Sequence, residues 1–539
     1  QYINEEKGVK TSEEAIKGAC DIVAEMVSDN AEARKKLREF LEKTAEISTT
    51  LKEGENFNTY TMYDNFKEKI MTIPSHRILA INRGESEKCL AVKIEANEEK
   101  CLQILEKEFL KGESIWTELL KQTLVDSFER LIMPSLDTEL RNKLTEVADE
   151  QAIKMFEVNL KPLLMQPPLK HKRILGLDPA YRTGCKLAAI DENGKVLATS
   201  VIYPTPPHND IAKSEMVVLQ MIDKFKIDAI SIGNGTASKE SEIFVANLLK
   251  KCPRKVSYMV VSEAGASVYS ASKLGAEEFP DYDVTQRSAV SIARRLQDPL
   301  AELIKIDVKS IGVGQYQHDM PQKRLTEVLD GVVEDCVNSV GVDLNTASPS
   351  LLSKVSGLNS GIAKNIVKYR EDNGAFTERK QLKKVAKLGD KAFEQCAGFL
   401  RIVGGKNILD NTAVHPESYE ATEKLLSLFN LKDSDIENHN VANLPSLINE
   451  NGEKKTAEQI GIGVPTLNDI TTELLKPGRD IRDELPAPML RTDVMEMKDL
   501  KEGMVLKGTV RNVIDFGAFV DIGVHQDGLV HISQICDHY

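Results

Sequence analysis

The sequence has few aromatic residues and few cysteines. Only 5% of its 539 residues are aromatic, and Trp116 is the single tryptophan. The eight cysteines are scattered, with no pair at Cys-x-x-Cys spacing, which argues against a zinc site or a disulfide framework. No apolar run is long enough to span a bilayer, and the first residues lack a signal-peptide pattern. We therefore expect a cytoplasmic protein with free thiols, no membrane partner and no bound metal.

The charge of the chain is unevenly distributed. Overall, 83 Asp and Glu residues outnumber 70 Lys and Arg residues, which gives a net charge of −13. This balance argues against a uniformly basic coat for nucleic acid, although the local field decides whether nucleic acid binds. Residues 345–405 have the opposite balance, with 11 Lys and Arg against 5 Asp and Glu, a local charge of +6. This basic island indicates a nucleic-acid contact, and an ordinary solvated helical surface is the alternative.

A chain of 539 residues suggests three to five domains. Helical periodicity prevails up to residue 170, interrupted by two strands expected at 77–81 and 90–94 around a turn at Asn82. Prolines and basic residues at 166–173 mark a boundary, after which three strands are followed by strand–helix alternation. This order predicts a mixed sheet with helices on its faces.

We therefore expect a multidomain, mainly α-helical protein with one α/β domain and a truncated C-terminal β-barrel. The chain begins without Met, and we expect it to be a fragment. The predicted segments are a helical scaffold with a small β insertion (1–170), the α/β domain (171–305), a helical connector (306–344), tandem helical hairpins (345–405), a helical domain (406–475), a linker (476–497) and the truncated β domain (498–539).

The most specific pattern lies in the C-terminal β segment. It consists of Asp-Phe-Gly-Ala-Phe-Val at 515–520, followed by Gly-Leu-Val-His-Ile-Ser at 528–533. This pattern resembles an S1-type RNA-binding domain, which is a five-stranded oligonucleotide-binding barrel. About three strands fit before Tyr539, so we expect the barrel to be incomplete.

Five residues of this segment are candidates for RNA binding. Phe516 and Phe519 flank a glycine at a strand start, and His531 lies within a later strand. Rings exposed on such a barrel stack on unpaired bases, which contributes about 1–3 kcal/mol per base. Lys507 and Arg511 are the candidate phosphate contacts. The alternative is that both phenylalanines belong to the core.

The basic island contains two stretches that resemble helix-hairpin-helix motifs. They read Val-Ser-Gly-Leu-Asn-Ser-Gly-Ile-Ala-Lys at 355–364 and Leu-Lys-Lys-Val-Ala-Lys-Leu-Gly-Asp-Lys at 382–391. In such a motif a tight glycine turn exposes backbone N–H groups at a helix start, which hold one phosphate without reading sequence. The candidate residues for DNA or phosphate binding are Gly357, Gly361, Lys364, Gly389 and Lys391.

Both copies depart from the family pattern Gly-hydrophobic-Gly. The first has Asn359 at the second glycine, a replacement that we expect to be tolerated because Asn adopts the left-handed conformation readily. The second has Lys387 at the first glycine, which weakens the resemblance. A glycine-capped helical hairpin used for packing is the alternative. Two copies within a basic segment favour nucleic-acid binding.

The strand order around Asp178 resembles the RNase H-like fold, in the branch of YqgF and RuvC. Active members of this fold use a cluster of carboxylates to hold two divalent cations, which activate water. The resemblance matches Asp178, at the end of the first strand, with the first catalytic Asp. Glu263, at the end of the last strand, is a second candidate.

The remaining acids of that fold are missing from the expected places. The chain has Gly-Asn-Gly at 233–235 after the fourth strand, and the register places Ser288 or its neighbours where the following helix needs an Asp. Asp298 lies ten residues further on, roughly 15 Å along a helix, and is too distant to share a metal pair. We therefore expect a vestigial site with no catalytic residue, in which Mg²⁺ or Mn²⁺ has a role only if cleavage activity survives.

Together these segments resemble the Tex family of transcription accessory proteins over nearly the whole chain. Specific stretches include Leu-Asp-Pro-Ala-Tyr-Arg-Thr-Gly at 177–184, in which Ala180 replaces a usual glycine, and Gly-Val-Gly-Gln-Tyr-Gln-His-Asp at 312–319. The resemblance implies RNase H-like, helix-hairpin-helix and S1-type modules on a helical scaffold, and kinship with a eukaryotic elongation factor. It also implies a helix-turn-helix portion before Gln1.

Three functions follow from these features. We favour a non-enzymatic transcription accessory factor that binds RNA, especially single-stranded RNA, and also DNA, and that needs no cofactor. RNA polymerase or the ribosome is then the expected protein partner, and a monomer is the expected state. The second function is a metal-dependent nuclease that uses Asp178 and Glu263. The third is a protein-interaction scaffold on the transcription or translation machinery.

Overall fold

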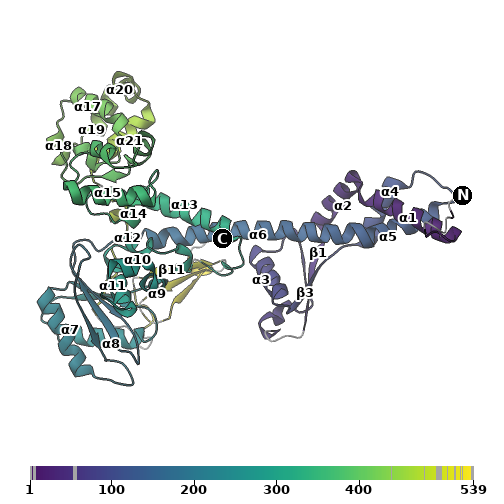
Figure 1. Cartoon of the computed structure of the whole chain (residues 1–539), viewed down its shortest axis with the longest axis horizontal. Coiled ribbons are helices and arrows are strands. Elements are labelled where there is room, and N and C mark those ends of the chain that lie inside the picture. Colours follow the sequence, from purple (N-terminus) through teal and green to yellow (C-terminus); the bar gives the residue numbers. More distant parts are fainter. Residues whose placement is uncertain are drawn as a thin grey trace. The chain divides into compact units, whose positions relative to one another are not determined.

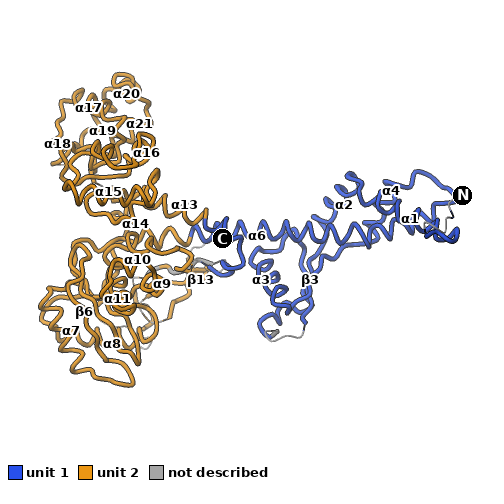
Figure 2. Tube along the Cα trace, viewed as in Figure 1, with its two compact units in different colours: residues 1–158, 314–326 blue, residues 159–313, 327–539 orange. Residues whose placement is uncertain are grey.

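The computed structural model describes residues 3, 8–52, 57–312, 314–438, 440–478, 480–492, 500–506, 508–514, 517–522, 524 and 526–535. Figure 1 labels the helices and strands along the sequence. The chain divides into two compact units, one of residues 1–158 and 314–326 and the other of residues 159–313 and 327–539 (Figure 2). Among the described residues, no helix is both long and apolar enough to cross a membrane.

The first unit combines helices with a small antiparallel sheet. Strands β1 (Glu46–Leu51), β2 (Phe66–Lys69) and β3 (Leu90–Glu95) pair in the order β2-β1-β3. Its helices bury one face each. In the second helix, for example, the buried residues Ala33, Leu37 and Leu41 recur at helical spacing. The helices that begin in this unit include α1 (Ser12–Ser28), α2 (Ala31–Thr44), α3 (Ser75–Ser86), α4 (Glu98–Phe109), α5 (Thr117–Asp126), the π-helical turn η3 (Ser127–Ile132) and α6 (Met133–Leu164).

One of the two strands predicted in this region is wrong. Residues 77–81 lie in α3, and the turn expected at Asn82 belongs to the same helix, whereas residues 90–94 lie in β3 as predicted. The apolar residues from Ile78 to Ile81 are all buried. A short continuous apolar run does not distinguish a buried helix from a strand, and Pro74, directly before α3, was the helix-start signal.

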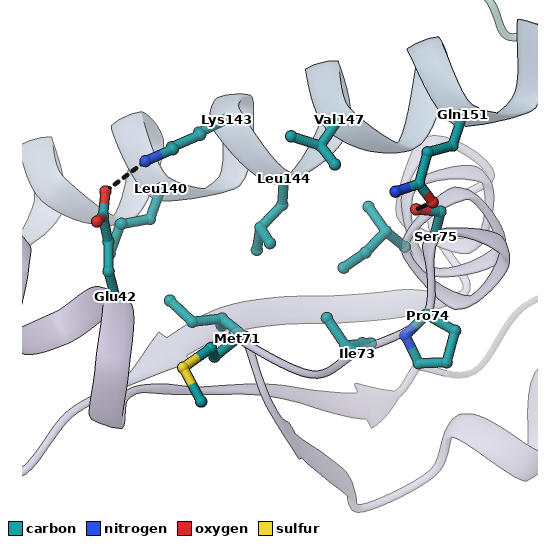
Figure 3. Close-up of a pocket in the computed structure, with 12 residues that line it drawn as sticks. Glu42, Met71, Ile73, Pro74, Ser75, Leu140, Lys143, Leu144, Val147 and Gln151 are labelled. Atoms are coloured by element: carbon teal, nitrogen blue, oxygen red, sulfur yellow. Dashed lines mark hydrogen bonds and ion pairs between the residues drawn. The ribbon is translucent and has the colours of Figure 1, made fainter. Parts of the chain in front are cut away.

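A cavity of about 350 Å³ lies in the first unit between α6 and the segment that leads into α3 (Figure 3). Eight of the twelve residues that line it are apolar, and the other four are Glu42, Ser75, Lys143 and Gln151. An ion pair between Lys143 of α6 and Glu42 of α2 (2.6 Å) lies at one side, and the hydroxyl of Ser75 donates a hydrogen bond to Gln151 at the other. The Ser75 contact joins the start of α3 to α6, while Val147 remains half exposed.

The second unit contains a five-stranded sheet in the order β6-β5-β4-β7-β8. Strand β5 is antiparallel to both β4 and β6, whereas β4, β7 and β8 run parallel. This is the mixed sheet that the sequence predicts. Its strands are β4 (Ile174–Asp178), β5 (Cys185–Ile190), β6 (Val196–Ile202), β7 (Ala229–Gly233) and β8 (Ser257–Val261).

Helices cover both faces of this sheet. On one face, α7 (Ile211–Phe225) and α8 (Ser238–Leu249) share an apolar cluster with Leu175 and Leu177 of β4. On the other face, α11 (Val284–Gln297) packs so closely that a Cβ on Gly176 would overlap the carbonyl oxygen of Ala289. Glycine is therefore required at 176. Because side chains alternate along a strand, Asp178 lies on the α11 side of β4.

The rest of the second unit is mainly helical. Arg379, only 1% exposed, ties the basic island to the helices that follow it, because its guanidinium donates hydrogen bonds to the carbonyl oxygens of Leu400 (2.7 Å) and Val414 (2.8 Å). The further helices include α9 (Ala266–Ala271), α10 (Lys273–Glu278), α12 (Pro299–Leu303), α13 (Gln322–Val340), α14 (Pro349–Leu352), α15 (Ser360–Asn373), η5 (Arg379–Lys384), α16 (Asp390–Cys396), α17 (Tyr419–Leu428), α18 (Asp433–Glu437), α19 (Leu444–Asn451), α20 (Glu453–Ile460) and α21 (Val464–Leu475).

The segment expected to be a linker is partly packed. Its 3₁₀ turn η8 (Ile481–Glu484) carries Arg482, which is 3% exposed and forms ion pairs with Asp480 (3.0 Å) and Asp298 (2.8 Å). Beyond it, β11 (Thr509–Ile514), β12 (Gly517–Asp521) and β13 (Gly528–His531) form an antiparallel sheet in that order.

Candidate nucleic-acid interface

Two helical hairpins in the basic island repeat each other at a spacing of 30 residues. The first turn connects α14 to α15, and the second connects η5 to α16. Gly357 and Lys387 occupy the same place in the two turns, with φ values of +78° and +67°. The buried residues recur in matching pairs: Leu352 and Leu382, Val355 and Val385, Leu358 and Leu388, Ala363 and Phe393, and Ile366 and Cys396.

Each hairpin contacts the turn of the other. A Cβ on Gly357 would lie 2.6 Å from the Cβ of Gln395 in α16. In the reciprocal place, the side chain of Asn365 in α15 donates a hydrogen bond to the carbonyl oxygen of Ala386 (2.7 Å). Asn365 and Gln395 are themselves 30 residues apart, so the same repeat relates both contacts. The two hairpins therefore form one packed body with two similar turns.

The two helix starts are capped differently. Asn359 is the N-cap of α15, and its Oδ1 accepts a hydrogen bond from the N–H of Ile362 (3.0 Å). Its φ is −119°, so the left-handed conformation expected at this residue is wrong; Gly357 holds that conformation instead, and Asn suits position 359 as a cap. Gly389, the N-cap of α16, offers no side-chain cap to the first N–H groups of that helix.

Exposed lysines surround both helix starts. Lys364 lies in the first turns of α15 and Lys391 in those of α16, and both are exposed, as are Gly361 and Gly389. Lys387 adds a further exposed charge at the second turn. Backbone N–H groups at a helix start accommodate a phosphate, and a nearby ammonium group strengthens the contact. The structure thus brings the predicted phosphate-binding residues together in two clusters.

The helices after the island contain a third hairpin that sequence reasoning missed. Helix α20 ends at Gly461, which has φ +79°, and α21 begins after Gly463. The N–H of Ile462 donates a hydrogen bond to the carbonyl oxygen of Ala457 (3.0 Å), which closes the helix end. Gly461-Ile-Gly463 is the unmodified Gly-hydrophobic-Gly pattern, so the signal was present, although outside the basic segment where such motifs were expected.

In the C-terminal sheet, the described candidate residues share one face. Phe519 of β12 is opposite Leu529 of β13, and Gly517 is opposite His531. Opposed residues point to the same side and side chains alternate along each strand, so Phe519 and His531 lie on the same face. Phe519 is partly buried and His531 is exposed. Phe516, Lys507 and the side chain of Arg511 fall outside the described part of the chain.

In the RNase H-like domain, Asp178 is mostly enclosed beneath α11. Burial raises the pKa of Asp178 to about 6, and the nearby charge of Glu263 acts in the same direction. A hydrogen bond from Ser288 and the charge of Lys186 oppose this rise in pKa. The hydroxyl of Ser288, on α11, thus meets the Asp178 carboxylate.

Glu263 reaches over the end of β7. A Cβ on Gly235 would overlap its carboxylate, and a Cβ on Gly233 would lie 2.7 Å from its Oε2. Asn234 accepts a hydrogen bond from the backbone N–H of Glu263 (3.0 Å). The buried Arg295 fixes the same loop by donating to the carbonyl oxygens on either side of Glu263 (2.7 and 2.8 Å). The glycines at 233 and 235 thus leave the space that the Glu263 carboxylate occupies.

Lys186 supplies a positive charge to this centre. It is opposite Asp178 in the β4–β5 register, and only 8% of it is exposed. Its ammonium group donates hydrogen bonds to the carbonyl oxygens of Gly184 (2.8 Å) and Thr183. The centre therefore holds Asp178, Glu263, Ser288 and Lys186 together.

Comparison with known proteins places these modules in one family. Family models match residues 1–156 (Tex central region-like), 172–297 (Tex protein YqgF-like domain), 337–401 (helix-hairpin-helix motif), 407–482 (HHH domain) and 499–539 (S1 RNA binding domain). The "Transcriptional accessory protein Tex" of Neisseria gonorrhoeae is 45% identical over 100% of this chain and 71% of its own length. The chain belongs to the Tex family.

Other relatives extend the Tex comparison. The protein YdcI of Bacillus subtilis is 52% identical over 100% of this chain and 75% of its own length. The human "S1 RNA-binding domain-containing protein 1" is 36% identical over 98% of this chain and 60% of its own length. The third hairpin, at Gly461, falls within the HHH match at 407–482. This Tex-family chain therefore combines helix-hairpin-helix and S1 modules, which support nucleic-acid binding, with a YqgF-like domain.

The RNase H-like fold implies a pair of divalent cations, and the residues of this Tex-family centre do not fit one. Among the residues that the structure describes, no group of three or more His, Cys, Asp and Glu side chains could hold a metal ion. Asp298 is engaged with the buried Arg482 instead (2.8 Å). Mg²⁺ needs a set of oxygen ligands, and two-metal chemistry needs carboxylates shared between the ions. Asp178 and Glu263 do not supply such a set.

Proposed function

We propose that this Tex-family protein is a non-catalytic nucleic-acid-binding factor that accompanies transcription. It holds single-stranded RNA on the β face of Phe519 and His531, and it holds the backbone of RNA or DNA at the two hairpin helix starts. The duplicated hairpin carries the proposal: one 30-residue repeat builds the same turn and an exposed, lysine-flanked helix start twice. Two equivalent phosphate contacts are what a backbone-binding platform needs.

Local charge favours the first two hairpins as the phosphate contacts. They lie in the segment 345–405 with its charge of +6. The third hairpin has the better sequence pattern, but residues 452–475 contain 2 Lys against 4 Asp and Glu, a charge of −2. Phosphate affinity depends on neutralising charge. We therefore assign packing within the helical domain, rather than phosphate binding, to the hairpin at Gly461.

The absence of catalysis is part of the proposal. Support comes from the residues that face Asp178, namely a serine where the fold needs an acid and a lysine beside it. RNA hydrolysis by this fold depends on metal-bound water, and two carboxylates hold metal weakly. Asp178 and Glu263 are thus remnants of a nuclease centre in this proposal.

The partners and compartment are proposed on independent grounds. RNA polymerase is the proposed protein partner because a relative carries the name transcriptional accessory protein, and the ribosome is the alternative. The described cysteines are free thiols, which suits the reducing cytoplasm. The proposed oligomeric state is a monomer.

The proposal is tested by titrating labelled single-stranded RNA and duplex DNA into the full chain over a series of salt concentrations. Phe519→Ala should weaken RNA binding by about 1–3 kcal/mol and leave DNA binding almost unchanged. Lys364→Ala and Lys391→Ala should each flatten the salt dependence by about one released counterion. Lys43→Ala, which removes an equally exposed charge from α2, is the matched control.

The same mixtures on denaturing gels test the absence of catalysis. Intact RNA with and without Mn²⁺, together with a salt-sensitive shift, supports the proposal. Metal-dependent cleavage that disappears in Asp178→Ala would instead establish a nuclease. Equal salt dependence in Lys364→Ala, Lys391→Ala and Lys43→Ala would remove the hairpins from the interface.

A further inference from the structure

Lys186 and Asp178 are neighbours across two strands. They are opposed in the antiparallel pairing of β4 with β5, so both side chains leave the sheet on the same face. That face is the one covered by α11, since Ala188, two residues after Lys186, packs with Ala289 of α11. The Lys186 side chain therefore lies on the face of the sheet that carries Asp178, which is the face where the RNase H-like fold places its metal ions.

Negative groups surround this ammonium. The Asp178 carboxylate interacts with its charge, and Asp283, the N-cap of α11, does so from the other end. The carbonyl oxygens of Thr183 and Gly184 accept its hydrogen bonds. Carboxylate and carbonyl oxygens are also the ligands of a hard divalent cation. The environment of Lys186 therefore resembles the oxygen-rich surroundings of such an ion.

We propose that Lys186 is a built-in cation that replaces the divalent metal in the RNase H-like centre of this chain. Its fixed single charge balances the carboxylate cluster and leaves no room for Mg²⁺ or Mn²⁺. A dication would be repelled by the ammonium group and would find Ser288, a poor ligand, where an acid is needed. The centre is thus ordered without metal, and nucleic-acid binding by the chain does not depend on metal. This proposal rests on the non-catalytic function proposed above and deepens it.

The proposal is tested by adding the missing ligand with and without the lysine. Mn²⁺ binding to the full chain is followed by electron paramagnetic resonance of the free ion and by the Mn²⁺-dependent shift in Tm. We compare the natural chain, Ser288→Asp, and the double variant Lys186→Met with Ser288→Asp. The natural chain should bind Mn²⁺ no more tightly than about 1 mM, the range of weak carboxylate sites. The double variant should bind at least tenfold more tightly, with a rise in Tm.

The single variant Ser288→Asp decides whether Lys186 competes with metal. In our proposal Lys186 pairs with the new carboxylate, so this variant should bind Mn²⁺ several-fold more weakly than the double variant. Equal binding by the two variants would overturn the proposal. Tight Mn²⁺ binding by the natural chain that is lost in Asp178→Asn would also overturn it. Lys186→Gln with Ser288→Asp replaces the double variant if circular dichroism shows that the methionine prevents folding.

The RNA titration of the same proteins separates this inference from the proposed function. Salt-sensitive RNA binding that is unchanged by a chelator supports both proposals. If the natural chain binds Mn²⁺ tightly at Asp178 but leaves RNA intact, Lys186 is not a substitute cation, while the non-catalytic function stands. If the chain cleaves RNA with Mn²⁺, both fail.

Discussion

Replacing Asp178 with Asn should stabilise the α/β domain at neutral pH. The carboxylate is mostly buried beneath α11, and burial raises its pKa to about 6 from an ordinary value of 3.8. A raised carboxyl pKa means that folding favours the protonated, neutral form. Asparagine has nearly the same shape and is neutral at every pH, and it can still accept the hydrogen bond from Ser288.

The size of the effect follows from the two pKa values. The difference between about 6 in the folded state and 3.8 in the unfolded state corresponds to about 3 kcal/mol at high pH, an upper limit for the stabilisation by Asn. Proton binding fixes the sign of the effect. Between pH 3.8 and about 6 the folded state binds more protons than the unfolded state, so the natural domain loses stability as pH rises through this range. The advantage of Asp178→Asn should be absent below pH 4, grow between pH 4 and 6, and be full above pH 6.

Hydrogen exchange of β4 and β7 amides is the appropriate assay, because it reports on this domain alone in a multidomain chain. At pH 7.5 these amides should exchange up to about a hundredfold more slowly in Asp178→Asn than in the natural chain. At pH 4 the two proteins should exchange equally. Comparison at each pH cancels the intrinsic pH dependence of exchange. Faster exchange in the variant at pH 7.5 would show that the charged carboxylate stabilises the fold, and would refute the reasoning.

Four further substitutions test the packing. Gly176→Ala should destabilise the α/β domain by about 1–3 kcal/mol, because the added Cβ meets the backbone of Ala289. Gly331→Ala lies in open space within α13 and should stabilise the protein by up to about 1 kcal/mol. Thermal unfolding measures both effects. Arg379→Met leaves several buried carbonyl oxygens without their donor and should cost about 3 kcal/mol or more, seen as a lower Tm. Lys387→Gly should raise the Tm slightly, since it relieves a left-handed lysine that costs about 1 kcal/mol, and an unchanged or lower Tm would show that the turn carries no strain.

The sheet of the α/β domain was predictable because its signals are local. The strand Ile174–Asp178 is an apolar run that ends in a carboxylate, and Asn193-Gly194 marks the hairpin between β5 and β6. Gly194 has φ +79°, which is what such a turn requires. The strand expected at 77–81 failed because four consecutive buried apolar residues carry no period.

The site residues also divide into those that local sequence signals could indicate and those that depend on strand pairing or packing. The helix register after the last strand is local, so sequence could point to the region of Ser288, whereas its contact with Asp178 is seen only in the structure. The role of Lys186 could not be predicted, because it depends on which residue of β4 lies opposite it. Lys387 was judged to weaken its hairpin, yet it adopts the positive φ of the equivalent Gly357. At Lys387, the packing of the hairpin repeat overrides the preference of a non-glycine residue for negative φ.

The net charge of −13 limits how this protein can bind nucleic acid. Long-range attraction cannot provide the affinity, because at physiological salt the field of the acidic modules falls off within about 8 Å and opposes approach elsewhere. In the proposed function, binding therefore comes from short-range contacts, namely the helix starts near Lys364 and Lys391 and the face of Phe519. Few phosphates are then neutralised, so the salt dependence should be shallow, at about −0.7 per phosphate contacted on a single strand. A steep dependence would show that a broader basic surface takes part.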